Sequence, residues 1–311
     1  MNDIASGKDA AQAAFPLEPA SPAELGFHEP ALARLRKLVQ SHIDQGRYPG
    51  AQIALARHGR LALFESFGRA STEPDRAARD ETLWLLFSNT KVITAVGVWV
   101  LVEEGLVRFS DRIAEHIPEF ARHGKGDITL AQVLSHRAGY PSQGASFECW
   151  SDHARLREEV CNFTLEWTPG TRLQYHGRAA HATCAVLIEA LTRMDYRDFL
   201  RTRVIEPLGL ARDMYVGVPD GAHERCALMH EPAPERGQRP LADENTPAYR
   251  RAGIPSSGGL APARGMPALY QMMGGYGRLN GRRLLSRRLI EFVTRNHTGD
   301  MFDHNMHMPM H

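Results

Sequence analysis

The period of the hydrophobic pattern changes near the start of the chain, and this change limits the fold class. Apolar side chains recur at helical intervals in residues 29–46, namely Leu32, Leu35, Leu38, Val39 and Ile43. Gly46 is placed to end that helix. Residues 50–68 then read as two strands, joined by a short turn in which Gly59 supplies a positive φ. A helix followed by a hairpin predicts the opening of an α+β domain.

Size and charge narrow the class of function. With 311 residues and 43% hydrophobic side chains, the chain can form one large domain or two small ones around a substantial core. Its 37 Lys and Arg residues face 36 Asp and Glu residues, for a formal net charge of +1. A net charge so close to zero does not predict the basic surface that a nucleic-acid-binding protein needs. We therefore expect a small-molecule substrate and no nucleic-acid partner.

The distribution of apolar and cysteine residues predicts a cytoplasmic protein. The longest apolar run, Val92 to Val102, is interrupted by Thr94 and Gly97 and is shorter than the ~20 residues that cross a bilayer. Residues 1–26 contain acids and no apolar core of a signal peptide. The four cysteines show no CxxC spacing and are predicted to be reduced thiols: Cys149, Cys161, Cys184 and Cys226.

Composition along the chain predicts its organisation. Residues 1–26 are rich in Ala, Pro and acids without periodicity, which predicts a flexible N-terminal tail. One domain is expected over 27–300, with a mostly helical subdomain at about 76–245. Residues 229–252 shift to Pro, Arg and Glu and are expected to form an exposed loop or lid. Residues 301–311 are expected to be an irregular tail.

A serine and a lysine stand three residues apart where a polar stretch meets the most apolar helix. Ser88 and Lys91 would lie one helical turn apart and on the same side. A serine hydroxyl needs a nearby base to become a nucleophile, and a lysine against an apolar wall shifts toward its neutral, proton-accepting form. Ser88 could instead simply cap the helix.

Several segments, in order along the chain, resemble one superfamily. The opening hairpin "YPGAQIALARHGRLALFESFG", the stretch "LFSNTKVITAVGVWVLVEEG" and "ITLAQVLSHRAGYP" are followed by "WTPGTRLQYHGRAAHA" and "GIPSSGGLAPA". Together they resemble serine β-lactamases and penicillin-binding proteins. The likeness is greatest to the branch of class C β-lactamases, family VIII carboxylesterases and D-Ala-D-Ala carboxypeptidase-like hydrolases, and covers about residues 27–300.

The resemblance implies a fold and a set of catalytic residues. The implied fold is β-lactamase/transpeptidase-like, an α+β arrangement in which an antiparallel sheet is flanked by helices and a helical subdomain is inserted. Ser88 would be the nucleophile, Lys91 its partner one turn along, and Tyr175 the tyrosine of the Y-x-N motif acting as general base. Gly177 stands where that motif has its asparagine, which disfavours a β-lactamase.

The third motif of the superfamily, K-T-G or H-T-G on a strand, has no clear counterpart. An "HTG" occurs at His297 to Gly299, but it follows a helical pattern directly and no alternating strand pattern comes after it. We interpret it as a segment upstream of the true motif, so that His297 is not catalytic. The chain would then end before the C-terminal strands of the sheet. The exposed sheet edge predicts a homo-oligomer or aggregation.

Three smaller signals have structural interpretations. The histidines and methionines of residues 297–311 could suggest a soft-metal tail, but no cysteine or carboxylate cluster accompanies them, so no metal site is predicted. His136 is expected to form a structural hydrogen bond in its turn. Gly258 and Gly259 are expected to allow close approach of the backbone near the cleft, or to form a plain turn.

The residues and the resemblance together predict a serine hydrolase that acts on a small ester through an acyl-enzyme, without a metal or organic cofactor. Two alternatives stay open. One is an amide hydrolase of the β-lactamase or D-amino-acid peptidase kind. The other is a truncated, non-catalytic homologue that keeps the motif but lacks an assembled site.

Overall fold

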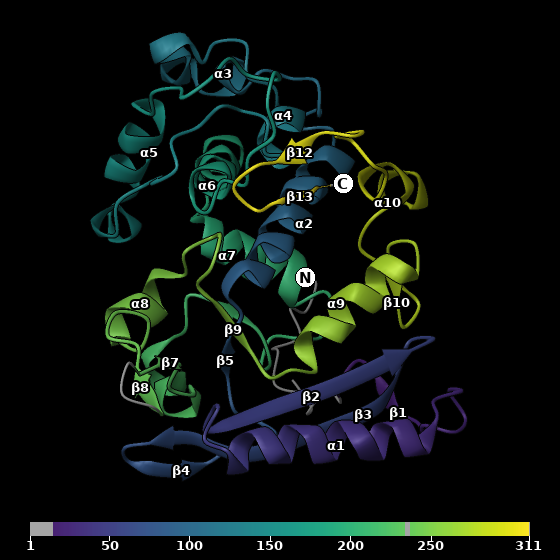
Figure 1. Ribbon diagram of the computed structural model, residues 1–311. Helices are drawn as coiled ribbons and strands as arrows, with labels where there is room; N and C mark the ends of the chain where they lie inside the picture. Colours follow the sequence, from purple (N-terminus) through teal and green to yellow (C-terminus); the bar gives the residue numbers. More distant parts are fainter. Residues whose placement is uncertain (1–14, 234–236, 311) are drawn as a thin grey trace, which may run out of the picture.

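The computed structural model describes residues 15–233 and 237–310 and shows a sheet at one end of the molecule with helices stacked above it (Figure 1). The sheet is built on the antiparallel pair β2 (Gly50–Arg57) and β3 (Arg60–Thr72). His58 and Gly59 form the turn, and both have a positive φ, of 54° and 74°. Such a turn matches the twist of the two strands. The predicted hairpin is therefore present.

Two short strands extend this sheet on the side of β3. β1 (Glu18–Pro19) pairs with β3 in parallel, and β4 (Asp75–Ala77) pairs with the far end of β3. Within the described residues, no strand pairs with the outer edge of β2. The outer edge of β2 is therefore unpaired in this part of the chain, as expected from the sequence.

Helices cover both faces of the sheet (Figure 1). Helix α1 (Glu29–Asp44) packs on β3 with Leu32 and Val39 buried, and Gly46 follows its end at φ 71°. Helix α9 (Gly265–Gly274) packs on β2 from the other side. The predicted helix over residues 29–46 is confirmed.

A second, smaller sheet and helix α2 form the centre of the molecule. β9 (Gly259–Ala261) pairs with both β5 (Trp84–Leu85) and β6 (Tyr215–Val216). After β5 comes the 3₁₀ turn η1 (Phe87–Asn89) and then α2 (Thr90–Glu103), which is buried on most of its surface. A Cβ at Gly97 would lie 2.4 Å from Cδ2 of Leu200, so glycine allows the close approach of a neighbouring helix.

The region between residues 110 and 226 is mostly helical. Its helical elements are α3 (Ile113–His116), η2 (Pro118–Gly124), α4 (Leu130–Leu134), η3 (Glu148–Ser151), α5 (His153–Cys161), α6 (Ala179–Thr192), α7 (Tyr196–Leu200), the π-helical turn η4 (Arg201–Ile205) and η5 (Asp220–Arg225). Residues 179–188 of α6 are all buried, and α6 packs against α2. One continuous core results.

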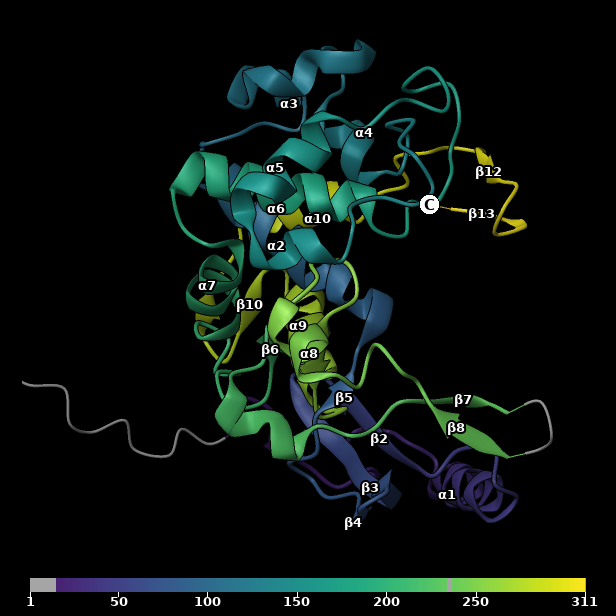
Figure 2. The same cartoon turned by 90° about the vertical axis from the view of Figure 1, so that its left-hand side faces the viewer.

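The remaining elements lie toward the C-terminus. They are the hairpin β7 (His230–Pro232) and β8 (Gln238–Pro240), α8 (Pro247–Ala252), β10 (Arg278–Leu279) with β11 (Arg282–Arg283), α10 (Arg287–Val293), and β12 (Phe302–Asp303) with β13 (Met308–Pro309). The β7–β8 hairpin projects from the body of the molecule (Figure 2). The loop expected over 229–252 is thus partly ordered.

Both predicted tails contain structure. Residues 1–14 and 311 lie outside the described residues, but residues 15–26 carry β1 and bury Leu17 and Leu25. The packed structure therefore begins before residue 27. The segment 301–311, expected to be irregular, carries the β12–β13 hairpin. These strands have two residues each and carry no hydrophobic period, so sequence pattern cannot reveal them.

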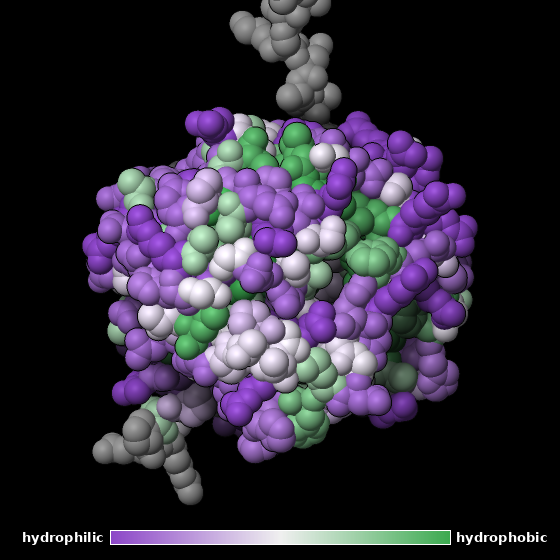
Figure 3. Space-filling model, turned by 90° about the horizontal axis from the view of Figure 1, so that it is seen from above, coloured by the Kyte–Doolittle hydropathy of each residue, from purple (hydrophilic) through white to green (hydrophobic). Residues whose placement is uncertain are grey.

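The surface of the molecule is mixed. In the view from above, hydrophobic side chains reach the surface in small groups among hydrophilic ones (Figure 3). No helix in the part of the chain that the structure describes is both long and apolar enough to cross a membrane. The four cysteines are free and buried.

Candidate active site

Ser88 lies exposed at the entrance to α2, and the small sheet fixes its turn. The strand before it, β5, pairs with β9, and the N–H of Leu86 donates to the carbonyl of Gly259 at 2.8 Å. Phe87, directly before Ser88, has a φ of 45°. Bulky residues rarely occupy this left-handed region, and such strain is found mainly at functional sites. The turn thus presents the Ser88 hydroxyl to solvent at the N-terminal end of a helix.

The structure brings the three predicted catalytic side chains together. The Tyr175 hydroxyl donates to Oγ of Ser88 at 2.6 Å, and Nζ of Lys91 donates to the same oxygen at 3.2 Å. Nζ of Lys91 also lies 4.9 Å from the centre of the Tyr175 ring. The serine oxygen is therefore within hydrogen-bond reach of two groups that can exchange protons.

Burial changes the protonation of Lys91. Its side chain is 8% exposed, and no carboxylate forms a salt bridge with it in the described residues. Removal from water lowers the pKa of Lys91 below its usual 10.5, while Tyr175 opposes part of this shift. Nζ donates to the carbonyl of Ser256 at 3.0 Å, which holds the amine in place. A lysine in this state can accept or relay the proton of Ser88.

The segment before β9 packs directly on α2. The Thr94 hydroxyl donates to the carbonyl of Pro255 at 2.7 Å, and the N–H of Gly259 donates to Oγ1 of Thr90 at 2.9 Å. A Cβ at Gly259 would lie 2.8 Å from that Oγ1, and one at Gly258 only 2.4 Å from a backbone nitrogen. Both glycines therefore permit close backbone approach, as expected from the sequence.

The turn that carries Tyr175 is held by His136. The N–H of Gln174 donates to the His136 carbonyl at 3.1 Å, and the N–H of His176 donates to its Nδ1 at 3.1 Å. Burial, and then the neighbouring His176 and Lys91, lower the pKa of His136 to about 3. His136 is therefore neutral and carries its proton on Nε2. The structural hydrogen bond expected for His136 is present.

One residue at the site was missed by sequence reasoning. Asp303 is fully buried and accepts the backbone N–H of Tyr175, 128 positions earlier in the chain. It comes from the segment interpreted as an irregular tail. No local pattern marks this aspartate, because its partner is a backbone group of a distant segment.

The "HTG" segment lies apart from this group. Residues 297–299 belong to no strand, and Nε2 of His297 lies 2.7 Å from the carbonyl of Phe292. The structure gives His297 no contact with Ser88, Lys91 or Tyr175. The interpretation of His297 as non-catalytic agrees with this position.

The histidines of the C-terminal segment do not gather into a metal site within the described residues, and His311 lies outside them. Within the described residues, one group of side chains lies close enough together to hold a metal ion, and it is formed by His153, Glu189 and Asp195.

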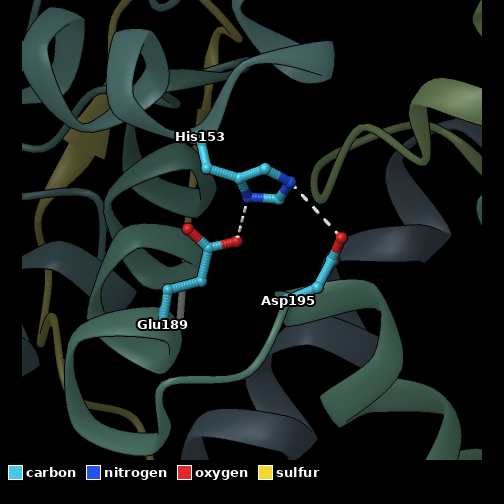
Figure 4. A group of neighbouring side chains, drawn as sticks. All are labelled: His153, Glu189 and Asp195. Carbon is cyan, nitrogen blue, oxygen red and sulfur yellow. Dashed lines mark hydrogen bonds and ion pairs between the residues drawn. The ribbon is translucent and has the colours of Figure 1, made fainter.

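In that group the imidazole lies between the two carboxylates, with one ring nitrogen toward each (Figure 4). Nδ1 of His153 lies 2.5 Å from Glu189, and its Nε2 lies 2.8 Å from a nitrogen of Arg197 and 3.3 Å from Asp195. A single metal ion could bind only one of the two ring nitrogens of His153. Binding at either nitrogen would require Arg197 to move away from Nε2. We interpret the group as a hydrogen-bonded link between α5, α6 and α7.

A cavity of about 210 Å³ lies next to the site but does not include it. Ala95 and Trp99 of α2 line it, continuing the face that carries Lys91, and His136 forms part of its wall. Ser88, Lys91 and Tyr175 do not line it. The cavity is therefore separate from the exposed Ser88.

The sequence matches the family model described as Beta-lactamase over residues 35–307. The chain belongs to the beta-lactamase family. This match spans most of the chain and includes Ser88, Lys91 and Tyr175, in agreement with the predicted superfamily.

Individual relatives carry related names. The chain is similar to "Esterase/beta-lactamase LipL" of Mycobacterium tuberculosis, with 27% identity over 92% of this chain and 72% of that protein. Among solved structures it is similar to a family VIII carboxylesterase, with 28% identity and a TM-score of 0.75 over 86% of this chain and 75% of that one. A penicillin-binding protein homologue from Caulobacter crescentus has 27% identity and a TM-score of 0.74, over 85% of this chain and 75% of that one. The predicted β-lactamase/transpeptidase-like fold is confirmed.

Proposed function

We propose that this protein is a serine hydrolase that cleaves a small ester through an acyl-enzyme. One observation carries the proposal: the exposed oxygen of Ser88 lies 2.6 Å from the Tyr175 hydroxyl and 3.2 Å from the Lys91 amine. A serine placed this way has both a proton acceptor and a route for the proton to the leaving group.

The proposed reaction has two steps. Oγ of Ser88 attacks the ester carbonyl and loses its proton to the Lys91 and Tyr175 pair. The same pair then protonates the departing alkoxide, so an alcohol leaves and the acyl group stays on Ser88. In the second step, water gives a proton to the pair and attacks the carbonyl of the acyl-enzyme. The bond to Ser88 then breaks, the acid leaves, and the pair returns the proton to Ser88. The positive end of α2 favours the negative charge that develops on the carbonyl oxygen.

The choice of an ester over an amide rests on Gly177. In the motif that the chain resembles, an asparagine amide at this position grips the substrate. A Cβ at Gly177 would meet nothing within 4 Å, so open space lies where that side chain would stand. Without this polar grip, a more reactive ester is the better substrate.

Two chromogenic substrates distinguish the ester hypothesis from the amide hypothesis. We expect turnover of p-nitrophenyl butyrate and none of nitrocefin. Gly177→Asn places the amide in open space, so this variant should fold normally and raise the nitrocefin to ester rate ratio. Turnover of nitrocefin by the unaltered protein would instead support the β-lactamase alternative, since the name of the relative LipL includes both esterase and beta-lactamase.

A covalent probe tests the nucleophile itself. Incubation with a fluorophosphonate should add one probe mass to the protein. Ser88→Ala should abolish the addition, whereas Ser151→Ala, which changes another exposed serine, should leave it unchanged. If the probe labels neither the unaltered protein nor either variant, the result would support the non-catalytic homologue.

Two further expectations belong to this proposal. The outer edge of β2, which has no partner strand among the described residues, supports a homo-oligomer formed by strand pairing between copies. Sedimentation equilibrium over a range of concentrations tests it, and a mass that stays monomeric would exclude it. The predicted cytoplasmic location stays a prediction, which fractionation of producing cells would test.

A further inference from the structure

Asp303 connects the end of the described chain to the candidate active site. It ends the short strand β12, which pairs with β13 in a hairpin at the edge of the molecule (Figure 2). The residue is 0% exposed. A buried carboxylate must be compensated by hydrogen bonds or opposite charges, so its partners indicate its role.

Both oxygens of the carboxylate are occupied by backbone donors. Oδ1 accepts the N–H groups of Asn305 and Met306, at 2.8 and 3.0 Å, and Oδ2 accepts the N–H of Tyr175. Burial opposes ionisation, but these three bonds lower the pKa of Asp303 below its usual 3.8. Asp303 is therefore a carboxylate at neutral pH, and such bonds to an anion are strong.

This carboxylate completes the support of the Tyr175 turn. The N–H groups of Gln174 and His176 are both held by His136, one through its carbonyl and one through its ring. The N–H between them, that of Tyr175, is held by Asp303. Three consecutive backbone donors are thus fixed from two sides. The phenol that projects from this turn reaches the Ser88 oxygen at 2.6 Å.

We propose that Asp303 is a positioning residue, which holds Tyr175 at the distance from Ser88 that proton transfer requires. This inference rests on the proposed serine hydrolase activity. Asp303 touches neither Ser88 nor Lys91, so it acts only through Tyr175. An asparagine at this position offers one oxygen instead of two, and its NH₂ group would face backbone donors.

The test compares Asp303→Asn with Asp300→Asn, which neutralises an exposed aspartate three residues earlier. For Asp303→Asn, kcat on p-nitrophenyl butyrate and the rate of fluorophosphonate labelling should both fall by about 10- to 100-fold, because a displaced catalytic group loses about this much. KM and the final extent of labelling should stay near those of the unaltered protein. Asp300→Asn should behave as wild type.

A double-mutant cycle separates positioning from general stability. In a Tyr175→Phe background, Asp303→Asn should cause no further loss of labelling rate, because the phenol that it positions is absent. Multiplicative losses, or equal rates for Asp303→Asn and Asp300→Asn, would overturn the proposal. If Asp303→Asn does not fold, Asp303→Glu serves the same cycle, because it keeps the charge but displaces it by one carbon. A wild-type protein that neither labels nor turns over ester would refute the proposed function itself.

Discussion

At the scale of single residues, the reactivity proposed for Ser88 depends on the protonation of Lys91. The amine is buried, and within the described residues its hydrogen bonds go to two neutral oxygens, those of Ser88 and Ser256. Burial lowers its pKa below 10.5, so the neutral form appears at a lower pH than in a free lysine.

This state predicts the pH dependence of labelling. The fluorophosphonate rate should rise with pH, with a midpoint below 10.5, as Lys91 loses its proton. Lys91→Arg should slow labelling by about 100-fold or more and remove this rise, because a guanidinium stays protonated. Lys37→Arg, which changes an exposed lysine, should leave the profile unchanged. A rate independent of pH up to 10.5 would contradict the role given to Lys91.

The three proposed catalytic residues differ in how far sequence could predict them. Ser88 and Lys91 are three positions apart, so helical spacing alone places them together. Tyr175 is 87 positions from Ser88, and only the family resemblance links the two. The contact of Asp303 with a backbone N–H follows from neither source.

At the scale of elements, strong hydrophobic periods predicted structure well. The helix α1 and the β2–β3 hairpin appear where their patterns place them. The two-residue strands β1 and β12 were not predicted. Backbone pairing defines these strands, that of β1 with the distant β3 and that of β12 with the neighbouring β13, and two residues are too few to show a side-chain period.

A buried lysine joins two elements of the helical region. Lys125 is 0% exposed, and its Nζ donates to the carbonyls of Arg122, Cys161 and Phe163 at 2.7 to 2.8 Å. The bonds tie the end of η2 to the end of α5. All three donor positions of the ammonium group are therefore used.

Replacing this lysine should destabilise the fold. Lys125→Met keeps much of the apolar stem but leaves three buried carbonyls without that partner, so the free energy of unfolding should fall by about 2–4 kcal/mol. Urea titration would measure the loss. Lys37→Met should change stability by less than about 0.5 kcal/mol, because it lies on the surface. Equal midpoints for the two variants would show that the three bonds contribute little.

At the scale of the whole molecule, the candidate site joins segments that lie far apart in the chain. The turn before α2, the 174–176 turn, the segment before β9 and the C-terminal hairpin meet there. Around Tyr175 this assembly buries three histidines, His136, His176 and His181. Sequence could not reveal this cluster, because the burial of each ring depends on the other segments.

These histidines couple the stability of the fold to pH. Burial lowers the pKa of His136 to about 3 and that of His176 to about 4, and the pKa of His181 also lies well below 6.5. In the unfolded chain each titrates near 6.5, so the unfolded state binds more protons between these values. Stability should therefore fall as pH drops from about 6.5 toward 4, by at most about 1.4 kcal/mol per pH unit for each histidine.

His176→Phe isolates one of these contributions. Both ring nitrogens of His176 are buried without a hydrogen-bond partner in the described residues, and the ring stacks on Trp167. Phenylalanine keeps the stacking and removes the unpartnered polar atoms, so at pH 7 the variant should match or exceed wild-type stability. Urea unfolding between pH 4.5 and 7 should show a slope smaller by about one bound proton. His28→Phe, at an exposed histidine, should keep the wild-type slope. Parallel stability curves for His176→Phe and wild type would mean that His176 titrates alike in the folded and unfolded chains.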